Sequence, residues 1–143
     1  MILLDTNIIS ELWRARPNPA VVSWLNNQST ASVYLCTPVL AELRFGAARL
    51  PPGVRKNVLN ASIDLLESHG YRDRILPFDL PSATMFGQLA AQRERIGRRI
   101  EPMDGMIAAI AASHRATLAT RDIADFSELG LDLINPFDVS IVP

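Results

Sequence analysis

Several residue types that define whole classes of protein are scarce in this sequence of 143 residues. Cys36 is the only cysteine, so a small fold held together by internal disulfides is excluded. His69 and His114 are the only histidines, and their spacing from Cys36 does not suit a zinc site. The longest apolar run, residues 106–112, is far shorter than the roughly 20 residues of a membrane-spanning helix. Because Asp5 interrupts the N-terminus, we also expect no signal peptide, and therefore a cytoplasmic protein.

Composition and charge fit one ordinary globular domain covering residues 1–143. Hydrophobic residues make up 48% and charged residues 20%, enough apolar material for a packed core. The net charge of −1 provides no overall positive field of the kind that indicates a nucleic-acid partner. Lys56 is the only lysine among the 14 basic residues. The arginine excess suits binding of phosphates or carboxylates, but genomic base composition explains it equally well.

Short apolar runs alternate with amphipathic segments along the chain, which is typical of a repeated strand–helix pattern. Prolines open several predicted helices, Asp79 is a predicted N-cap, and residues 51–53 (Pro-Pro-Gly) separate two helices. We predict a three-layer α/β/α domain with a mostly parallel sheet of about five short strands. The predicted strands are residues 2–4, 33–36, 74–78, 117–120 and 131–134, and the predicted helices are residues 6–14, 19–28, 38–50, 54–69, 80–96, 102–114 and 123–129.

Four acidic residues stand beside apolar segments at the ends of these predicted elements. Asp5 directly follows the first strand, and Asp122 lies just beyond the fourth. Glu42 and Asp104 lie near the starts of their helices, and Ile107 follows Asp104 on the same helical face. The carboxyl ends of parallel strands meet at one edge of a sheet, where ligands bind. The pattern therefore predicts that the four acids share one pocket.

Such a group of carboxylates requires a cation. Two unit charges about 4 Å apart repel by about 4 kcal/mol at an effective dielectric constant near 20. An all-oxygen donor set favours one or two Mg²⁺ or Mn²⁺ ions over zinc. These ions activate water for attack on phosphorus and neutralise the leaving oxygen, so no nucleophilic side chain is required. Thr6, Asn7 and Thr120 are placed to orient the water or the ligands through hydrogen bonds.

Each candidate also has a purely structural explanation. Asp5 is placed to cap the helix that follows it. Glu42 and Asp104 suit the positive end of a helix dipole, and Asp122 suits a turn. Thr120 equally well ends a strand. The metal-site interpretation therefore depends on the four acids meeting in space.

Four motifs in order along the chain resemble PIN-domain proteins. They are Leu-Leu-Asp-Thr-Asn at residues 3–7, Ala-Glu-Leu-Arg at 41–44, Asp-Gly-Met-Ile-Ala-Ala at 104–109 and Leu-Ala-Thr-Arg-Asp-Ile-Ala-Asp-Phe at 118–126. The sequence looks most similar to the VapC-like toxins of bacterial type II toxin–antitoxin pairs, including their FitB-type branch. The resemblance covers essentially the whole chain.

This resemblance implies a Mg²⁺- or Mn²⁺-dependent endoribonuclease that forms homodimers. It implies that Asp5 and Asp104 are the main metal ligands, that Glu42 and Asp122 complete the ligand set, and that Thr120 supports them. It also implies a small antitoxin that blocks the acidic groove, often with an arginine, and binds operator DNA with its other end. Candidate contacts to RNA or antitoxin are Arg14, Arg16, Arg44, Arg98 and Arg99, although exposure at the surface alone accounts for any one of them.

Two other functions fit parts of the sequence. A phosphatase of the haloacid dehalogenase type also has an Asp after its first strand, but it needs an Asp-x-Asp arrangement and a phosphate-binding lysine. Position 7 is Asn here, and Lys56 lies in a polar stretch. A catalytically idle subunit that binds RNA or a partner and helps to repress its own operon is the non-enzymatic alternative. Retention of the four acids argues against it.

Overall fold

The computed structural model describes residues 1–138, so the last five residues of the predicted domain lie outside the described part. Within the described residues five strands form one sheet in the order β3-β2-β1-β4-β5, and every neighbouring pair is parallel. Leu3, at the centre, pairs with Tyr34 on one side and with Leu118 on the other. The predicted fold class is confirmed. The strands are β1 (Ile2–Leu4), β2 (Val33–Cys36), β3 (Ile75–Leu76), β4 (Thr117–Ala119) and β5 (Leu133–Ile134).

The helices begin and end largely where the sequence predicts. A proline lies in the first turn of α2, α3, α5 and α6, and Asp79 caps α5 by accepting a hydrogen bond from the Ser82 amide. Gly97 follows α5 with a φ of 73°, a left-handed conformation that glycine adopts easily. The helices are α1 (Thr6–Leu12), α2 (Pro19–Asn26), α3 (Thr37–Ala48), α4 (Val54–Leu65), α5 (Leu80–Arg95), α6 (Pro102–Ser113) and α7 (Ile123–Phe126), with short helical turns η1 (Thr30–Ser32) and η2 (Leu66–Gly70).

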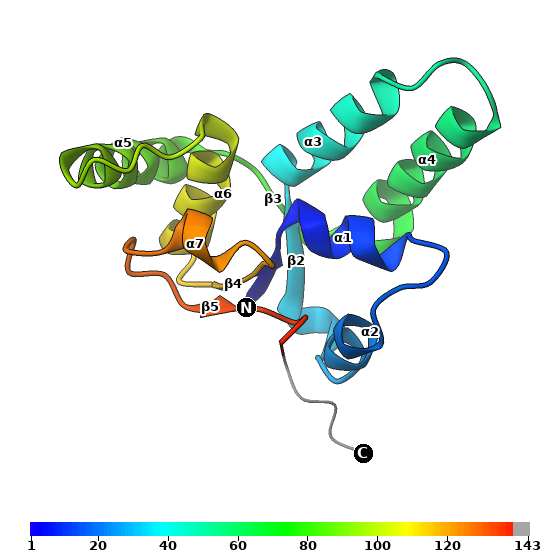
Figure 1. Ribbon diagram of the computed structural model, residues 1–143, viewed down its shortest axis with the longest axis horizontal. Helices are drawn as coiled ribbons and strands as arrows, with labels where there is room; N and C mark the ends of the chain where they lie inside the picture. Colours follow the sequence, from blue (N-terminus) through cyan, green and yellow to red (C-terminus); the bar gives the residue numbers. More distant parts are fainter. Residues whose placement is uncertain (139–143) are drawn as a thin grey trace.

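The helices cover both faces of the sheet. Figure 1 shows α1 to α4 on one side of the central strands and α5 to α7 on the other. This follows from the strand order, because the chain builds outward from β1 to β3 and then crosses to β4 on the other side of β1. The order therefore reverses between β1 and β4, and the loops after these two strands diverge toward opposite faces. In open parallel sheets this is where ligands bind.

Packing of α6 against α5 positions the segment that carries Asp104. The residue that follows it, Gly105, is buried, and a Cβ atom there would lie 2.7 Å from the Phe86 ring of α5. Ile107, Ala108, Ala109, Ile110 and Ala111 of α6 are also buried. The start of α6 is thus fixed closely against its neighbour. No helix within residues 1–138 is long and apolar enough to cross a membrane.

Some predicted elements are shorter in the structure. The first helix ends at Leu12 instead of Arg14, because the Arg14 amide bonds to the Glu11 carbonyl in a tightened final turn. The third strand keeps only Ile75 and Leu76 of the predicted residues 74–78. It lies at the edge of the sheet, and Pro77 has no amide hydrogen with which to extend the pairing.

Candidate active site

The four predicted acids line one cavity of about 480 Å³ at the carboxyl edge of the sheet. Asp5 follows β1 and Asp122 follows the neighbouring β4, directly at the reversal of strand order. Glu42 projects into the cavity from α3, and Asp104 from the first turn of α6. Four elements far apart in the sequence thus each contribute one carboxylate.

Asp5 is the most deeply buried of the four acids, with 5% of its surface exposed. It is the N-cap of α1 and accepts a 2.7 Å hydrogen bond from the Thr6 amide, so the capping interpretation is correct. Its other oxygen, Oδ2, accepts hydrogen bonds from Thr120 Oγ1 at 2.7 Å and from Asn7 Nδ2 at 3.2 Å. Burial raises the pKa of Asp5 to about 6 even though the hydrogen bonds from Thr120 and Thr6 lower it. A cap alone does not explain a carboxylate held in so unfavourable a place.

Asn7 connects the loops that follow β1 and β4. Its Nδ2 group lies within hydrogen-bond distance of Asp5 Oδ2, of Thr120 Oγ1 at 3.3 Å and of Asp122 Oδ2 at 3.0 Å. Its Oδ1 accepts a 3.2 Å hydrogen bond from the Arg121 amide. The single asparagine therefore fixes the spacing of two of the acids and the backbone between them.

Glu42 is held by a hydroxyl group from the neighbouring helix. Thr6 Oγ1 of α1 donates a 2.6 Å hydrogen bond to Glu42 Oε1 of α3. The Thr6 amide simultaneously binds Asp5. One residue thus orients two carboxylates, one through its backbone and one through its side chain.

Asp104 is half-buried, and no hydrogen bond to its carboxylate is found among residues 1–138. Burial and then the nearby charges of Asp5, Asp125, Glu42 and Asp122 raise its pKa to about 6. Asp104 therefore faces the other acids without a compensating donor. This is the behaviour expected of a carboxylate whose partner is a cation.

The donors fit a hard divalent ion with retained water. All four candidate ligands are carboxylates, the oxygen donors that Mg²⁺ and Mn²⁺ prefer. Within the described part of the chain, no three His, Cys, Asp or Glu side chains are close enough to hold a metal ion by themselves. A hydrated ion does not need such a cluster, since Mg²⁺ keeps several waters and commonly binds through one or two carboxylates. The cavity has room for these waters.

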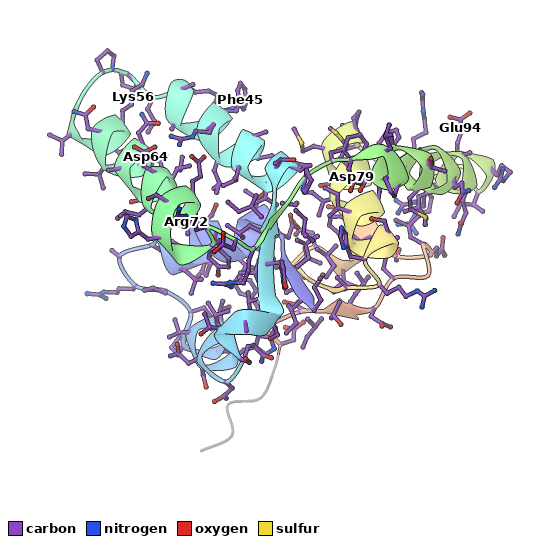
Figure 2. The ribbon with its side chains drawn as sticks, turned by 180° about the vertical axis from the view of Figure 1, so that it is seen from behind. Phe45, Lys56, Asp64, Arg72, Asp79 and Glu94 are labelled. Carbon is purple, nitrogen blue, oxygen red and sulfur yellow. The ribbon has the colours of Figure 1, made fainter. Side chains whose placement is uncertain are left out.

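Among the predicted arginine contacts, only Arg14 lines this cavity. Arg16 is exposed in the segment before α2 and is not part of the lining. Arg44 lies only two residues from Glu42, but its guanidinium group forms ion pairs with Asp64 at 2.7 Å and with Glu67 at 3.0 Å. Figure 2 shows Asp64 on α4, which packs against α3.

Arg98 and Arg99 lie on the α5–α6 side. Arg98 pairs with Glu128 at 3.3 Å and donates to backbone and hydroxyl oxygens of the α7 segment. Arg99 lies 3.9 Å from Glu94 and lines a small recess of about 90 Å³ that also contacts Asp104. Arg98 therefore supports the loop after α7, whereas Arg99 stands beside the cavity.

Sequence reasoning missed three residues that line the cavity, namely Ser10, Glu11 and Arg121. A helical spacing gives a signal for two of them, because Asn7, Ser10, Glu11 and Arg14 fall three or four positions apart on one face of α1. Arg121 lies inside a quoted motif, between Thr120 and Asp122. Its neighbours in sequence do not reveal that its side chain turns toward the cavity.

Comparison with known proteins agrees with this architecture. Residues 2–131 match the model of the PIN domain family. Over 96% of its length the chain is 42% identical to VapC ribonuclease Y4jK of Sinorhizobium fredii and 42% identical to Toxin FitB of Neisseria gonorrhoeae, covering 99% of each. A solved structure of FitAB bound to an IR36 DNA fragment superposes with a TM-score of 0.90 at 41% identity, covering 98% of both chains. Fold, motif order and similarity agree, and this chain belongs to the PIN domain family.

Proposed function

We propose that this protein is a Mg²⁺- or Mn²⁺-dependent endoribonuclease and the toxin of a bacterial toxin–antitoxin pair, acting in the cytoplasm. The observation that carries the proposal is the cavity in which four carboxylates from four separate elements meet, two of them with a pKa raised to about 6. The names of the similar proteins, a VapC ribonuclease and the toxin FitB, support it. The substrate class is RNA.

Asp5, Glu42, Asp104 and Asp122 would hold one or two ions. A bound ion would supply an activated water for attack on phosphorus and would neutralise charge on the leaving oxygen. The chain's own part is positioning. The burial of Asp5 and its three hydrogen-bond donors fix its carboxylate against the sheet, and the Thr6 hydroxyl fixes Glu42. Asp104 carries no competing protein donor in the described chain, so it is the carboxylate most available to the ion.

Thr6, Asn7 and Thr120 would act by holding these ligands in place. Thr120 is fully buried, donates to Asp5 and accepts from the Asp122 amide at 3.0 Å. It therefore joins the loop that follows β4 to the acid that follows β1. In other metal sites, removing a hydrogen bond that holds a metal ligand commonly lowers metal affinity or activity by about 10- to 100-fold.

We further propose that a small antitoxin binds beside the cavity. A groove of about 570 Å³ between α1, α3 and α4 shares Thr6, Ser10, Arg14 and Glu42 with the acidic cavity. Its remaining lining is largely apolar and includes Trp13, Leu43, Val58 and Leu59. An antitoxin segment with apolar side chains would fill the groove and carry a basic side chain into the cavity. The structurally similar FitAB complex contains DNA, and we propose that operator DNA reaches this chain only through the antitoxin.

We also propose a homodimer, on the basis of family membership. Several large hydrophobic side chains are exposed on the single chain, including Phe45 on α3, Phe78 before α5 and Leu80 at its first turn, 64%, 36% and 85% exposed. Figure 2 shows Phe45 directed away from the body of the chain. Exposed apolar side chains of this size suit contact with a second copy. Sedimentation of the purified chain tests this directly.

The alternatives gain no support from the geometry. Lys56, which a phosphatase would need at the phosphate, instead donates to the carbonyls of Ala48 at 3.3 Å and Leu50 at 3.2 Å beside the α3–α4 loop. It is not part of the cavity lining. An idle subunit would not need four carboxylates that face one cavity and form no ion pair within residues 1–138. We therefore retain only the ribonuclease.

The test is cleavage of a mixed RNA pool by antitoxin-free protein with Mg²⁺, Mn²⁺ or EDTA. We expect cleavage with either ion, none with EDTA, and a loss of at least about 100-fold in Asp5→Asn and Asp104→Asn. The control is Asp73→Asn, an exposed acid just before β3 at the opposite edge of the sheet. Equal cleavage by all variants would refute the assigned roles. Release of inorganic phosphate from small esters would indicate a phosphatase, and RNA binding without turnover an idle subunit.

A further inference from the structure

Two arginines line a cavity that is otherwise dominated by acids. Arg14 follows the end of α1, and Arg121 lies in the loop between β4 and α7. Both are exposed. Within residues 1–138 neither arginine forms an ion pair with any of the four acids, and Arg14 instead pairs with Glu11 at 3.2 Å. The lining of the cavity thus includes two guanidinium groups that are not paired with these acids in the described residues.

Glu11 holds Arg14, one of these two arginines. It is only 6% exposed and accepts a 2.8 Å hydrogen bond from the Asn18 amide as well as the bond from Arg14. The hydrogen bond from the Asn18 amide lowers the pKa of Glu11, and the nearby charges of Arg14 and Arg121 lower it further. A buried, ionised anchor therefore holds Arg14 in place and lies close to Arg121.

The guanidinium group of Arg121 contacts an aromatic ring but has no acidic partner within the described residues. Its amide is bonded to Asn7 Oδ1, and its guanidinium carbon lies 5.0 Å from the centre of the Phe137 ring. Although Asp122 is the next residue, no carboxylate oxygen within residues 1–138 lies within 4.0 Å of the Arg121 guanidinium nitrogens. Stacking on an aromatic face leaves the in-plane N–H groups free to donate.

We propose that Arg121, assisted by Arg14, binds an RNA phosphate next to the one that is cleaved. The inference rests on the proposed function, since the cleaved phosphate would lie at the acids. RNA carries a phosphate on each side of that position, and a guanidinium group can bind two phosphate oxygens at once. Free donors at the border of the same cavity suit that neighbouring phosphate. Arg121 is then a substrate-positioning residue that also sets the direction in which the strand leaves the cavity.

The test measures RNA binding in the Asp104→Asn background, where cleavage does not interfere. A fluorescent single-stranded RNA is titrated by anisotropy at several salt concentrations in Mg²⁺, with and without Arg121→Gln. Loss of one phosphate contact on single-stranded RNA should reduce the slope of log affinity against log salt by about 0.7. This corresponds to about fivefold weaker binding at about 0.1 M salt, relative to a reference near 1 M. Arg121→Lys should retain most of the slope, because it retains the charge.

The control is Arg72→Gln, an exposed arginine outside the cavity that should leave both affinity and slope unchanged. In the cleaving protein, Arg121→Gln should raise KM about fivefold or more and change kcat less than about threefold. An unchanged salt slope and affinity in Arg121→Gln would overturn the inference, even if antitoxin binding weakened. Loss of kcat with unchanged KM would also overturn it.

The outcomes separate this inference from the proposed function. If the unsubstituted protein cleaves RNA and Arg121→Gln behaves like it, only the phosphate contact is wrong. If no RNA is cleaved but Arg121→Gln still lowers the salt slope, the contact is right and the ribonuclease assignment is wrong. If RNA does not bind at all, both are wrong. Urea unfolding of each variant establishes that it is folded before binding is compared.

Discussion

Replacing Asp5 with asparagine should stabilise the metal-free protein at neutral pH. The Asp5 carboxylate is 5% exposed, and burial raises its pKa from 3.8 to about 6. At about 1.4 kcal/mol per pH unit, that difference means that ionised Asp5 destabilises the folded state by roughly 3 kcal/mol above pH 6. Asn is uncharged and nearly the same shape. It therefore removes the charge while leaving the site filled.

Part of this gain is offset by lost hydrogen bonds. An asparagine oxygen can still accept from the Thr6 amide, but its NH₂ group cannot accept from Thr120 Oγ1 or Asn7 Nδ2 at the other position. Losing these bonds costs about 1–2 kcal/mol. We therefore expect a net stabilisation of about 1–2 kcal/mol at pH 7.5.

The pH dependence provides the sharper signature. Because the folded pKa of Asp5 is raised, the folded state binds the proton more tightly, and wild-type stability falls as pH rises from about 4 to about 6. Below pH 4 Asp5 is protonated in both states and the advantage of the variant disappears. Urea unfolding with EDTA between about pH 3 and 8 measures this, with Asp73→Asn as the control. A variant that is equally destabilised at every pH would refute the reasoning.

Three further substitutions test how the cavity is held. Gly105→Ala should lower the free energy of unfolding by about 1–3 kcal/mol in a urea titration, because its Cβ would lie 2.7 Å from Phe86. Gly87→Ala on α5, where a Cβ would meet open space, should be neutral or slightly stabilising in the same titration. Thr6→Val removes the 2.6 Å hydrogen bond to Glu42 and should lower RNA cleavage about 10-fold, whereas Thr84→Val, which loses only a bond to its own helix, should cleave normally. Arg93→Met should lower the free energy of unfolding by about 2–4 kcal/mol by calorimetry, because buried Arg93 donates to the Asp125 and Ser127 carbonyls at α7 and to the Arg98 carbonyl in the loop after α5. Exposed Arg95→Met should have little effect. If a substitution and its control variant had equal effects, the role assigned to that contact would be wrong.

The sequence predicted the strands best where they lie at the centre of the sheet. Residues 2–4 and 33–36 have the predicted bounds, since both are short apolar runs with clear boundaries and a neighbouring strand on each side. The edge strands, β3 and β5, are shorter than predicted. Apolar character alone does not indicate how far pairing continues at an edge, where Pro77 and a single neighbouring strand decide the length.

The acidic cavity was predictable because each acid is tied to the end of an element. Parallel topology brings those ends to one edge, so local sequence carries the placement of Asp5 and Asp122. The arginines were less predictable because their partners are distant. Arg44 stands two residues from Glu42 yet pairs with Asp64 on another helix, whereas Arg121 stacks on Phe137 near the end of the described chain. Long side chains follow contacts that only the folded structure creates.

The most direct test of the account is calorimetric titration of the metal-free protein with Mn²⁺ at pH 7.5. If the carboxylates in the cavity form a divalent-ion site, wild type and Asp73→Asn should bind one or two ions with equal affinity. Asp104→Asn should then bind at least about 10-fold more weakly. Equal Mn²⁺ binding by Asp104→Asn, Asp5→Asn and wild type would contradict the central claim.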